Sequence, residues 1–201
     1  MSNAVIQPQG RFALTNGHIV LPDRVVEGKA LIVEDAHLIA VGDLGDLGSD
    51  TTQIDVAGRI ITPGLIDIHI HGAVGHSFNE PDVNAWGAIT GENVKRGVTS
   101  LLATLSTASL SNLIACLAFS RDWMNSPGAG TQVIGVHLEG PYFSYAQRGA
   151  QDPQYLRTPD DGSVDQLLAH ADVLRIMSFA PELPGGLELT ARLAKLGVVP
   201  A

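Results

Sequence analysis

The chain has 201 residues, of which 45% are hydrophobic and 16% charged, proportions that are ordinary for a globular protein. Its formal net charge of -9, without a local cluster of Lys and Arg, argues against a surface for nucleic acid or an anionic membrane. A single cysteine, no apolar run near the roughly 20 residues of a membrane helix and no secretory signal lead us to expect a cytoplasmic protein.

The first part of the chain has the pattern of a small β-domain. Short β-prone runs alternate with turn residues at Asn16-Gly17, Pro22-Asp23 and Glu34-Asp35, where we expect hairpins. These strands would form a small antiparallel sheet or part of a β-sandwich. We therefore place a first domain at residues 1–62.

After Pro63 the pattern changes to alternating strands and helices. We predict strands at Leu65–His71, Val98–Thr104, Gln132–Glu139, Leu174–Ala180 and a start at Val198–Val199, with helices at Val83–Arg96, Ser109–Met124, Ser163–His170 and Gly186–Leu196. Such alternation implies an α/β fold with a parallel sheet and right-handed crossovers, either open and doubly wound or closed into a barrel. No Gly-rich phosphate-binding loop follows the first strand, which disfavours the dinucleotide-binding open sheet.

The first of these strands alternates polar and apolar side chains. In the stretch LIDIHIHG, Asp67, His69 and His71 share one face, and we expect the isoleucines to face the covering helices. Burying unpartnered polar groups costs roughly a few kcal/mol each. A divalent cation offsets that cost, because two imidazoles one residue apart can both reach an ion at about 2.0–2.1 Å. A pair of hydrogen-bonded histidines is the competing interpretation.

A second pair of polar side chains ends another predicted strand. In GVHLEGP, His137 and Glu139 share a face just before Gly140-Pro141 breaks the strand. Two strands of one parallel sheet then both end in residues that can bind metal, so we predict His69, His71 and Glu139 as metal ligands. For His137 we expect a supporting role beside the ligands rather than a place among them.

Three motifs together resemble the amidohydrolase superfamily. PGLIDIHIHG is shared by many of its members. GVTSLLATLST and, more specifically, GVHLEGPYFSYAQRGAQDPQYLR are similar to the N-acetylglucosamine-6-phosphate deacetylase family within it. The resemblance runs from about Phe12 to Ala201 and implies a metal-dependent (β/α)8 TIM-type barrel with a small β-sandwich, usually as a homodimer. Residues 63–201 would then be the first half of the barrel.

The resemblance implies roles for individual residues. Glu139 would be the central metal ligand, while His69 and His71 match two ligands that some members use for a second metal, so one or two zinc or iron ions are expected. Ala150 and Gln151 match substrate-binding positions. Many members carry His in place of Gln151, near the acetyl carbonyl of the substrate. Gln can still donate a hydrogen bond, but it cannot carry positive charge.

The resemblance also implies which parts of the site lie elsewhere. It places the proton-donating aspartate, two further metal-binding histidines and the phosphate contacts beyond residue 201, so we expect no catalytic residue in this chain and no activity from it alone. For the complete protein it implies hydrolysis of N-acetylglucosamine 6-phosphate, an amino-sugar phosphate, to glucosamine 6-phosphate and acetate. The alternatives are N-acetylgalactosamine 6-phosphate or another cyclic amide as substrate, and a non-catalytic truncated fragment.

Overall fold

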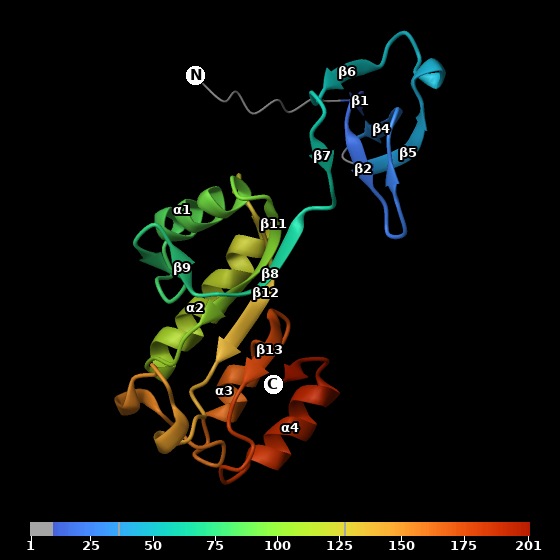
Figure 1. The fold of residues 1–201 in the computed structure, drawn as a ribbon. Helices are drawn as coiled ribbons and strands as arrows, with labels where there is room; N and C mark the ends of the chain where they lie inside the picture. The colour runs from blue at the N-terminus through green and yellow to red at the C-terminus, as the bar shows by residue number, and fades with distance from the viewer. Residues whose placement is uncertain (1–9, 36, 127) are drawn as a thin grey trace. The chain divides into compact units, whose positions relative to one another are not determined.

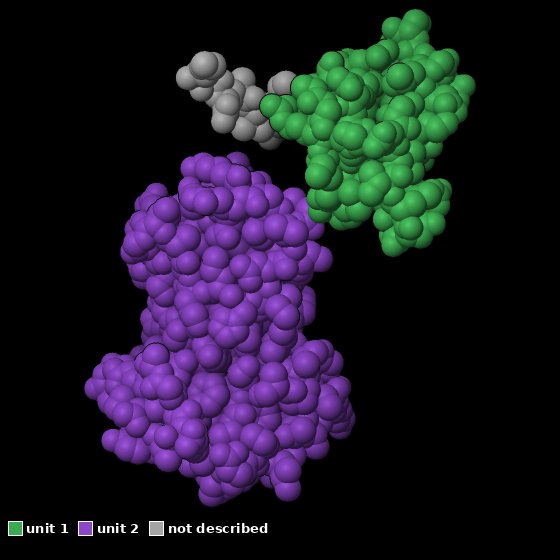
Figure 2. All heavy atoms as spheres, viewed as in Figure 1, with its two compact units in different colours: residues 1–63 green, residues 64–201 purple. Residues whose placement is uncertain are grey.

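The chain divides into two compact units. The computed structural model describes residues 10–35, 37–126 and 128–201 (Figure 1). One unit comprises residues 1–63 and the other residues 64–201, coloured separately in Figure 2. Within the described residues, every helix is too short or too polar to cross a membrane.

The first unit contains two small sheets. One has the order β5-β4-β1-β6 and consists of β1 (Arg11–Thr15), β4 (Lys29–Glu34), β5 (His37–Asp43) and β6 (Thr52–Asp55). The other has the order β3-β2-β7 and consists of β2 (His18–Val20), β3 (Val25–Val26) and β7 (Ile60–Ile61). A 3-10 helix spans Leu44–Asp46. The buried side chains Ala13, Ala30 and Ile32 form a small core.

Two of the three predicted hairpins are confirmed, and one is wrong. Pro22-Asp23 lies between the antiparallel strands β2 and β3, and Glu34-Asp35 begins the turn between antiparallel β4 and β5. At Asn16-Gly17, however, the chain passes from one sheet to the other, because β1 and β2 pair with different partners. Of the two arrangements that we expected, a small antiparallel sheet is wrong, since β6 pairs in parallel with β1 and β7 in parallel with β2, while part of a β-sandwich stays a prediction. Because the parallel partners of β1 and β2 lie far away in the sequence, the residues of the Asn16-Gly17 turn do not indicate how these strands pair.

The second unit is built on a five-stranded parallel sheet. Its order is β14-β13-β12-β11-β8, with β8 (Leu65–Ile70), β11 (Val98–Leu105), β12 (Gln132–Glu139), β13 (Leu174–Ser178) and β14 (Val199–Pro200). The crossovers contain α1 (Val83–Val94), α2 (Leu110–Asn125), α3 (Val164–Leu168) and α4 (Gly186–Lys195). A hairpin of β9 (Gly72–Ala73) and β10 (His76–Ser77) follows β8, and 3-10 helices span Tyr145–Gln147 and Pro153–Tyr155. Every strand and helix predicted after Pro63 is confirmed, with ends that differ by a few residues.

Local sequence explains where the longer helices begin. The carboxylate of Asp82 accepts hydrogen bonds from the backbone N–H groups of Asn84 and Ala85 at the start of α1. The hydroxyl of Ser109 accepts one from Asn112 N at the start of α2. Asp and Ser are preferred at this position because they satisfy amide groups that have no partner inside the helix.

All four helices contribute to one hydrophobic core. It contains Trp86 of α1, Leu117 of α2, Leu167 of α3 and Leu193 of α4 together with side chains of the sheet. Strands that follow one another in sequence order, joined by right-handed crossovers, carry their helices on one face. The unit is therefore mixed α/β, with a partial parallel sheet of half-barrel type whose other face is free of these helices.

The expectation for the isoleucines of β8 holds for only one of them. Ile70 packs against the core, whereas Ile66 and Ile68 are 64% and 56% exposed. The reason is the position of β8 at the edge of the sheet, where α1 packs against β9, β10 and β11 instead. The alternation of the strand correctly separated Ile70, which packs against the core, from His69, which meets His71, but alternation alone does not determine what covers a face.

Candidate metal centre

The three predicted ligands meet at the carboxyl edge of the parallel sheet. His69 lies on β8, His71 directly follows that strand, and Glu139 is the last residue of β12. Strand β11 lies between them in the sheet. In open parallel sheets this edge, outside the carboxyl ends of the strands, is where ligands bind.

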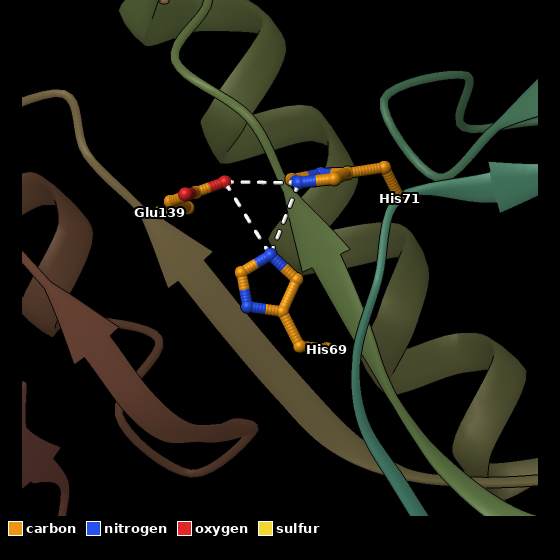
Figure 3. A group of neighbouring side chains, drawn as sticks. All are labelled: His69, His71 and Glu139. Atoms are coloured by element: carbon orange, nitrogen blue, oxygen red, sulfur yellow. Dashed lines mark hydrogen bonds and ion pairs between the residues drawn. The ribbon is translucent and has the colours of Figure 1, made fainter. Parts of the chain in front are cut away.

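The ligand atoms of these side chains point toward one another (Figure 3). His69 Nε2 lies 3.2 Å from His71 Nε2. Glu139 Oε2 lies 2.9 Å from His71 Nε2 and 3.8 Å from His69 Nε2. A circle through three atoms at these separations has a radius of about 2 Å, close to the bond length of zinc to His nitrogen or carboxylate oxygen. One ion can therefore contact all three atoms.

The surroundings of the Glu139 carboxylate also indicate a cation-binding site. Its Oε2 atom is buried and has no hydrogen bond among the described residues, although His71 Nε2 is only 2.9 Å away. A buried carboxylate oxygen without a hydrogen bond costs free energy unless a cation compensates it. Two imidazoles and one carboxylate are also a set of donors that zinc and iron accept.

Ser106 contacts His71 and is itself held by Asn79, and reasoning from sequence did not identify Ser106. The Ser106 hydroxyl lies 2.9 Å from His71 Nδ1, the ring nitrogen that faces away from Glu139. Asn79 bonds the backbone of Ser106 twice, accepting from its N–H at 2.9 Å and donating to its carbonyl at 3.0 Å. The only signal in the sequence is that Ser106 follows the apolar strand β11, at the same edge as the ligands.

His137 has the surroundings expected of a supporting residue. Its Nδ1 donates to the carbonyl of Ile68 at 3.2 Å, so its Nε2 accepts from Ser178 Oγ at 2.8 Å. Nδ1 is thus hydrogen-bonded to β8 and Nε2 to β13, so neither nitrogen is left to bind a metal ion. The ring also packs edge-to-face on His69, with centroids 4.9 Å apart. Burial lowers the pKa of His137, which favours the neutral ring that this bonding requires.

Gln151 is held by the same segment that contacts His71. Its side-chain carbonyl accepts a hydrogen bond of 2.9 Å from Thr107 N, so its amide NH2 is left as the free donor. Thr107 Oγ1 also donates to the carbonyl of Glu139 at 3.3 Å. Ala150 is exposed beside Gln151.

Gly140 allows the Thr107 side chain to lie close to the main chain that follows Glu139. Its φ of 89° lies in the left-handed region, which glycine adopts without strain. A Cβ atom at this position would overlap Thr107 Oγ1. Glycine is therefore required for the chain to turn directly after the predicted ligand.

Comparisons with known proteins place the chain in a family. A sequence model of the amidohydrolase family matches residues 60–191, more than half of the chain. The chain belongs to the amidohydrolase family. The match includes all three predicted ligands, and the resemblance to amidohydrolases expected from the motifs is confirmed.

The relatives of this amidohydrolase include sugar-phosphate deacetylases. N-acetylglucosamine-6-phosphate deacetylase of Haemophilus influenzae is 30% identical over 94% of this chain and 49% of that protein. N-acetylgalactosamine-6-phosphate deacetylase of Escherichia coli O157:H7 is 30% identical over 87% and 48%. The structure of N-acetylglucosamine-6-phosphate deacetylase from Pasteurella multocida matches with a TM-score of 0.87 at 27% identity, covering 94% of this chain and 50% of that one. The chain spans about half the length of the curated relatives it matches.

Proposed function

We propose that the complete protein hydrolyses the acetamide of N-acetylglucosamine 6-phosphate to glucosamine 6-phosphate and acetate. The observation that carries the proposal is the triangle of His69 Nε2, His71 Nε2 and Glu139 Oε2, whose buried carboxylate oxygen has no hydrogen bond in the part of the chain that the structure describes. The family and the names of the relatives support the choice of reaction.

The proposal assigns the three side chains to one or two divalent ions, zinc or iron. Such an ion supplies Lewis acidity, which activates water and polarises an amide carbonyl. His69 and His71 each present Nε2, and Glu139 supplies the negative charge that the ion requires. Gln151 presents an uncharged N–H donor near the same edge, suited to an acetyl oxygen or a sugar hydroxyl.

The rest of the catalytic apparatus is proposed by resemblance. In a protein of the relatives' full length, the aspartate that protonates the departing amine lies outside the half that matches residues 1–201. The same resemblance supports a closed eight-stranded barrel, a β-sandwich that includes residues 1–62, and a homodimer. For residues 1–201 alone it supports metal binding without turnover.

Acetate release tests the proposal. We expect the full-length protein, loaded with zinc or iron, to release acetate from N-acetylglucosamine 6-phosphate, and Glu139→Gln to lower kcat/KM by at least about 100-fold because an amide is a weak ligand. Glu188→Gln, on the exposed surface of α4, is the matched control and should retain activity. No acetate from the wild-type protein, or full activity of Glu139→Gln, would refute the proposal. Acetate release by residues 1–201 alone would contradict the expectation of an inactive fragment.

N-acetylgalactosamine 6-phosphate is a second candidate substrate. The observation that favours it is the Escherichia coli relative, which is named for that sugar and matches at the same 30% identity as the Haemophilus relative. The two sugars differ only in the configuration of one hydroxyl. Comparing kcat/KM for both sugars in the assay above decides between them.

A further inference from the structure

A polar contact outside the three predicted ligands lies behind the imidazole of His71. The backbone carbonyl of His71 accepts a hydrogen bond of 2.8 Å from the N–H of Phe78, which fixes the main chain at this residue. The imidazole is 41% exposed, so the main chain alone does not determine how the ring is turned. Ser106 Oγ, 2.9 Å from Nδ1, is the polar contact on the far side of the ring from Glu139.

A neutral imidazole carries one hydrogen, on either Nδ1 or Nε2. His69 Nε2 and His71 Nε2 lie 3.2 Å apart. For His71 Nε2 to bind a cation it needs a free lone pair, so a neutral His71 ligand carries its hydrogen on Nδ1. The group that bonds to Nδ1 therefore influences whether His71 can serve as a ligand.

We propose that Ser106 is a positioning residue that accepts a hydrogen bond from Nδ1–H of His71 and so presents the Nε2 lone pair to the metal. The inference rests on the proposed function, because it assigns Ser106 to the same site. Ser106 does not touch the cation; it acts through His71. Outer hydrogen-bond partners of this kind fix the ring orientation of metal-binding histidines in many proteins.

The position of Ser106 is itself built into the fold. Asn79 bonds both the N–H and the carbonyl of Ser106, and Asn112 of α2 donates to the carbonyl of Asn79 at 3.1 Å. Ser106 is thus held between the segment after β10 and the start of α2. A main chain fixed in this way keeps the Ser106 side chain within reach of the His71 ring.

Metal affinity and the tautomer of His71 test the inference together. We expect Ser106→Ala to weaken Co²⁺ binding by about 10- to 100-fold and to alter the Co²⁺ absorption spectrum. Ser106→Thr keeps the hydroxyl and should bind nearly as tightly as the wild type. Ser100→Ala is the matched control, because Ser100 is a half-buried serine on β11, the strand that Ser106 follows, and has no side-chain hydrogen bond among the described residues.

The tautomer is read from ¹⁵N shifts of labelled histidine in the metal-free chain, with His71 assigned by comparison with His71→Ala. We expect the Nδ1–H form in the wild type and a mixture in Ser106→Ala. An Nε2–H form in the wild type, or an unchanged tautomer and Co²⁺ affinity in Ser106→Ala, would overturn the inference. Failure of the wild type to bind Co²⁺ or Zn²⁺ would instead count against the proposed function, since the metal-free tautomer still decides the role of Ser106.

Discussion

Tyr142 is fully buried directly after the predicted ligand segment, and its hydroxyl lies 2.7 Å from Ser163 Oγ. Burial raises the pKa of Tyr142 to about 12, above the value near 10 of an exposed phenol. Between these values the unfolded chain loses the Tyr142 proton while the folded chain keeps it. The folded state then binds more protons, so its stability falls as the pH rises from about 10 to about 12.

We predict that Tyr142→Phe removes this dependence. The wild type should show a phenolate absorbance step near pH 12 that is absent from Tyr142→Phe. Between about pH 10 and about pH 12, the free energy of unfolding of the wild type should fall more than that of Tyr142→Phe, by on the order of 2 kcal/mol. Absorbance at 295 nm and urea unfolding at several pH values provide the measurements. Identical titration curves for the two proteins would contradict the prediction.

At the scale of single residues, the sequence was sufficient to predict which three side chains meet, and that His137 lies beside them, but it did not predict Ser106. His69, His71 and Glu139 follow from alternation along two strands and from the rule that parallel strands end at one edge. Ser106 depends on how Asn79, 27 residues away in sequence, fixes the end of β11. That contact arises only from the packing of the segment after β10 against α2, which no local pattern encodes.

The β9–β10 hairpin has an unusual residue in its turn. Val74 and Gly75 connect the paired residues Ala73 and His76, and their φ angles are 48° and 85°. Two positive φ angles define the tight turn that suits the twist of a hairpin, but a β-branched side chain is strained there. Val74 is also 60% exposed, so little packing offsets the strain.

We predict that Val74→Asn raises the free energy of unfolding by about 1 kcal/mol, because Asn tolerates the left-handed region. Urea denaturation followed by circular dichroism measures the change. Val83→Asn is the control, since Val83 is 62% exposed but begins helix α1, and it should give no gain. Equal effects of the two substitutions would show that the gain comes from surface polarity and not from the turn.

At the scale of elements, helices and buried strands were predicted well because their periodicity is local. The apolar face of α2 is an example: Leu113 and Leu117 are buried in the core, as their spacing predicts. The exposure of Ile66 on β8 and the parallel pairing of β6 with β1 could not be predicted in this way. Both depend on which segment lies alongside a strand, and that is a property of topology.

At the scale of the whole molecule, a bound cation should stabilise the second unit. Ligand that binds only the folded state adds about 2.7 kcal/mol of stability at a free concentration 100 times its dissociation constant. Both tryptophans, Trp86 and Trp123, lie in the core of this unit, so their fluorescence reports on its unfolding.

We therefore predict that Zn²⁺ raises the midpoint of thermal unfolding followed by tryptophan fluorescence, and that a chelator reverses the shift. Glu139→Gln should lose most of the shift, whereas Glu188→Gln should keep it. A shift of equal size in Glu139→Gln would mean that zinc binds elsewhere in the chain.

The order of the strands has a consequence for how the site is assembled. The three side chains come from β12 and from β8 with the residue that follows it, and only β11 separates these strands in the sheet. Pairing of β8, β11 and β12 is therefore sufficient to bring the imidazoles and the carboxylate together. Among the described residues, β13 and β14 add no side chain to this group, so substitutions confined to those two strands would leave the triangle of donor atoms in place.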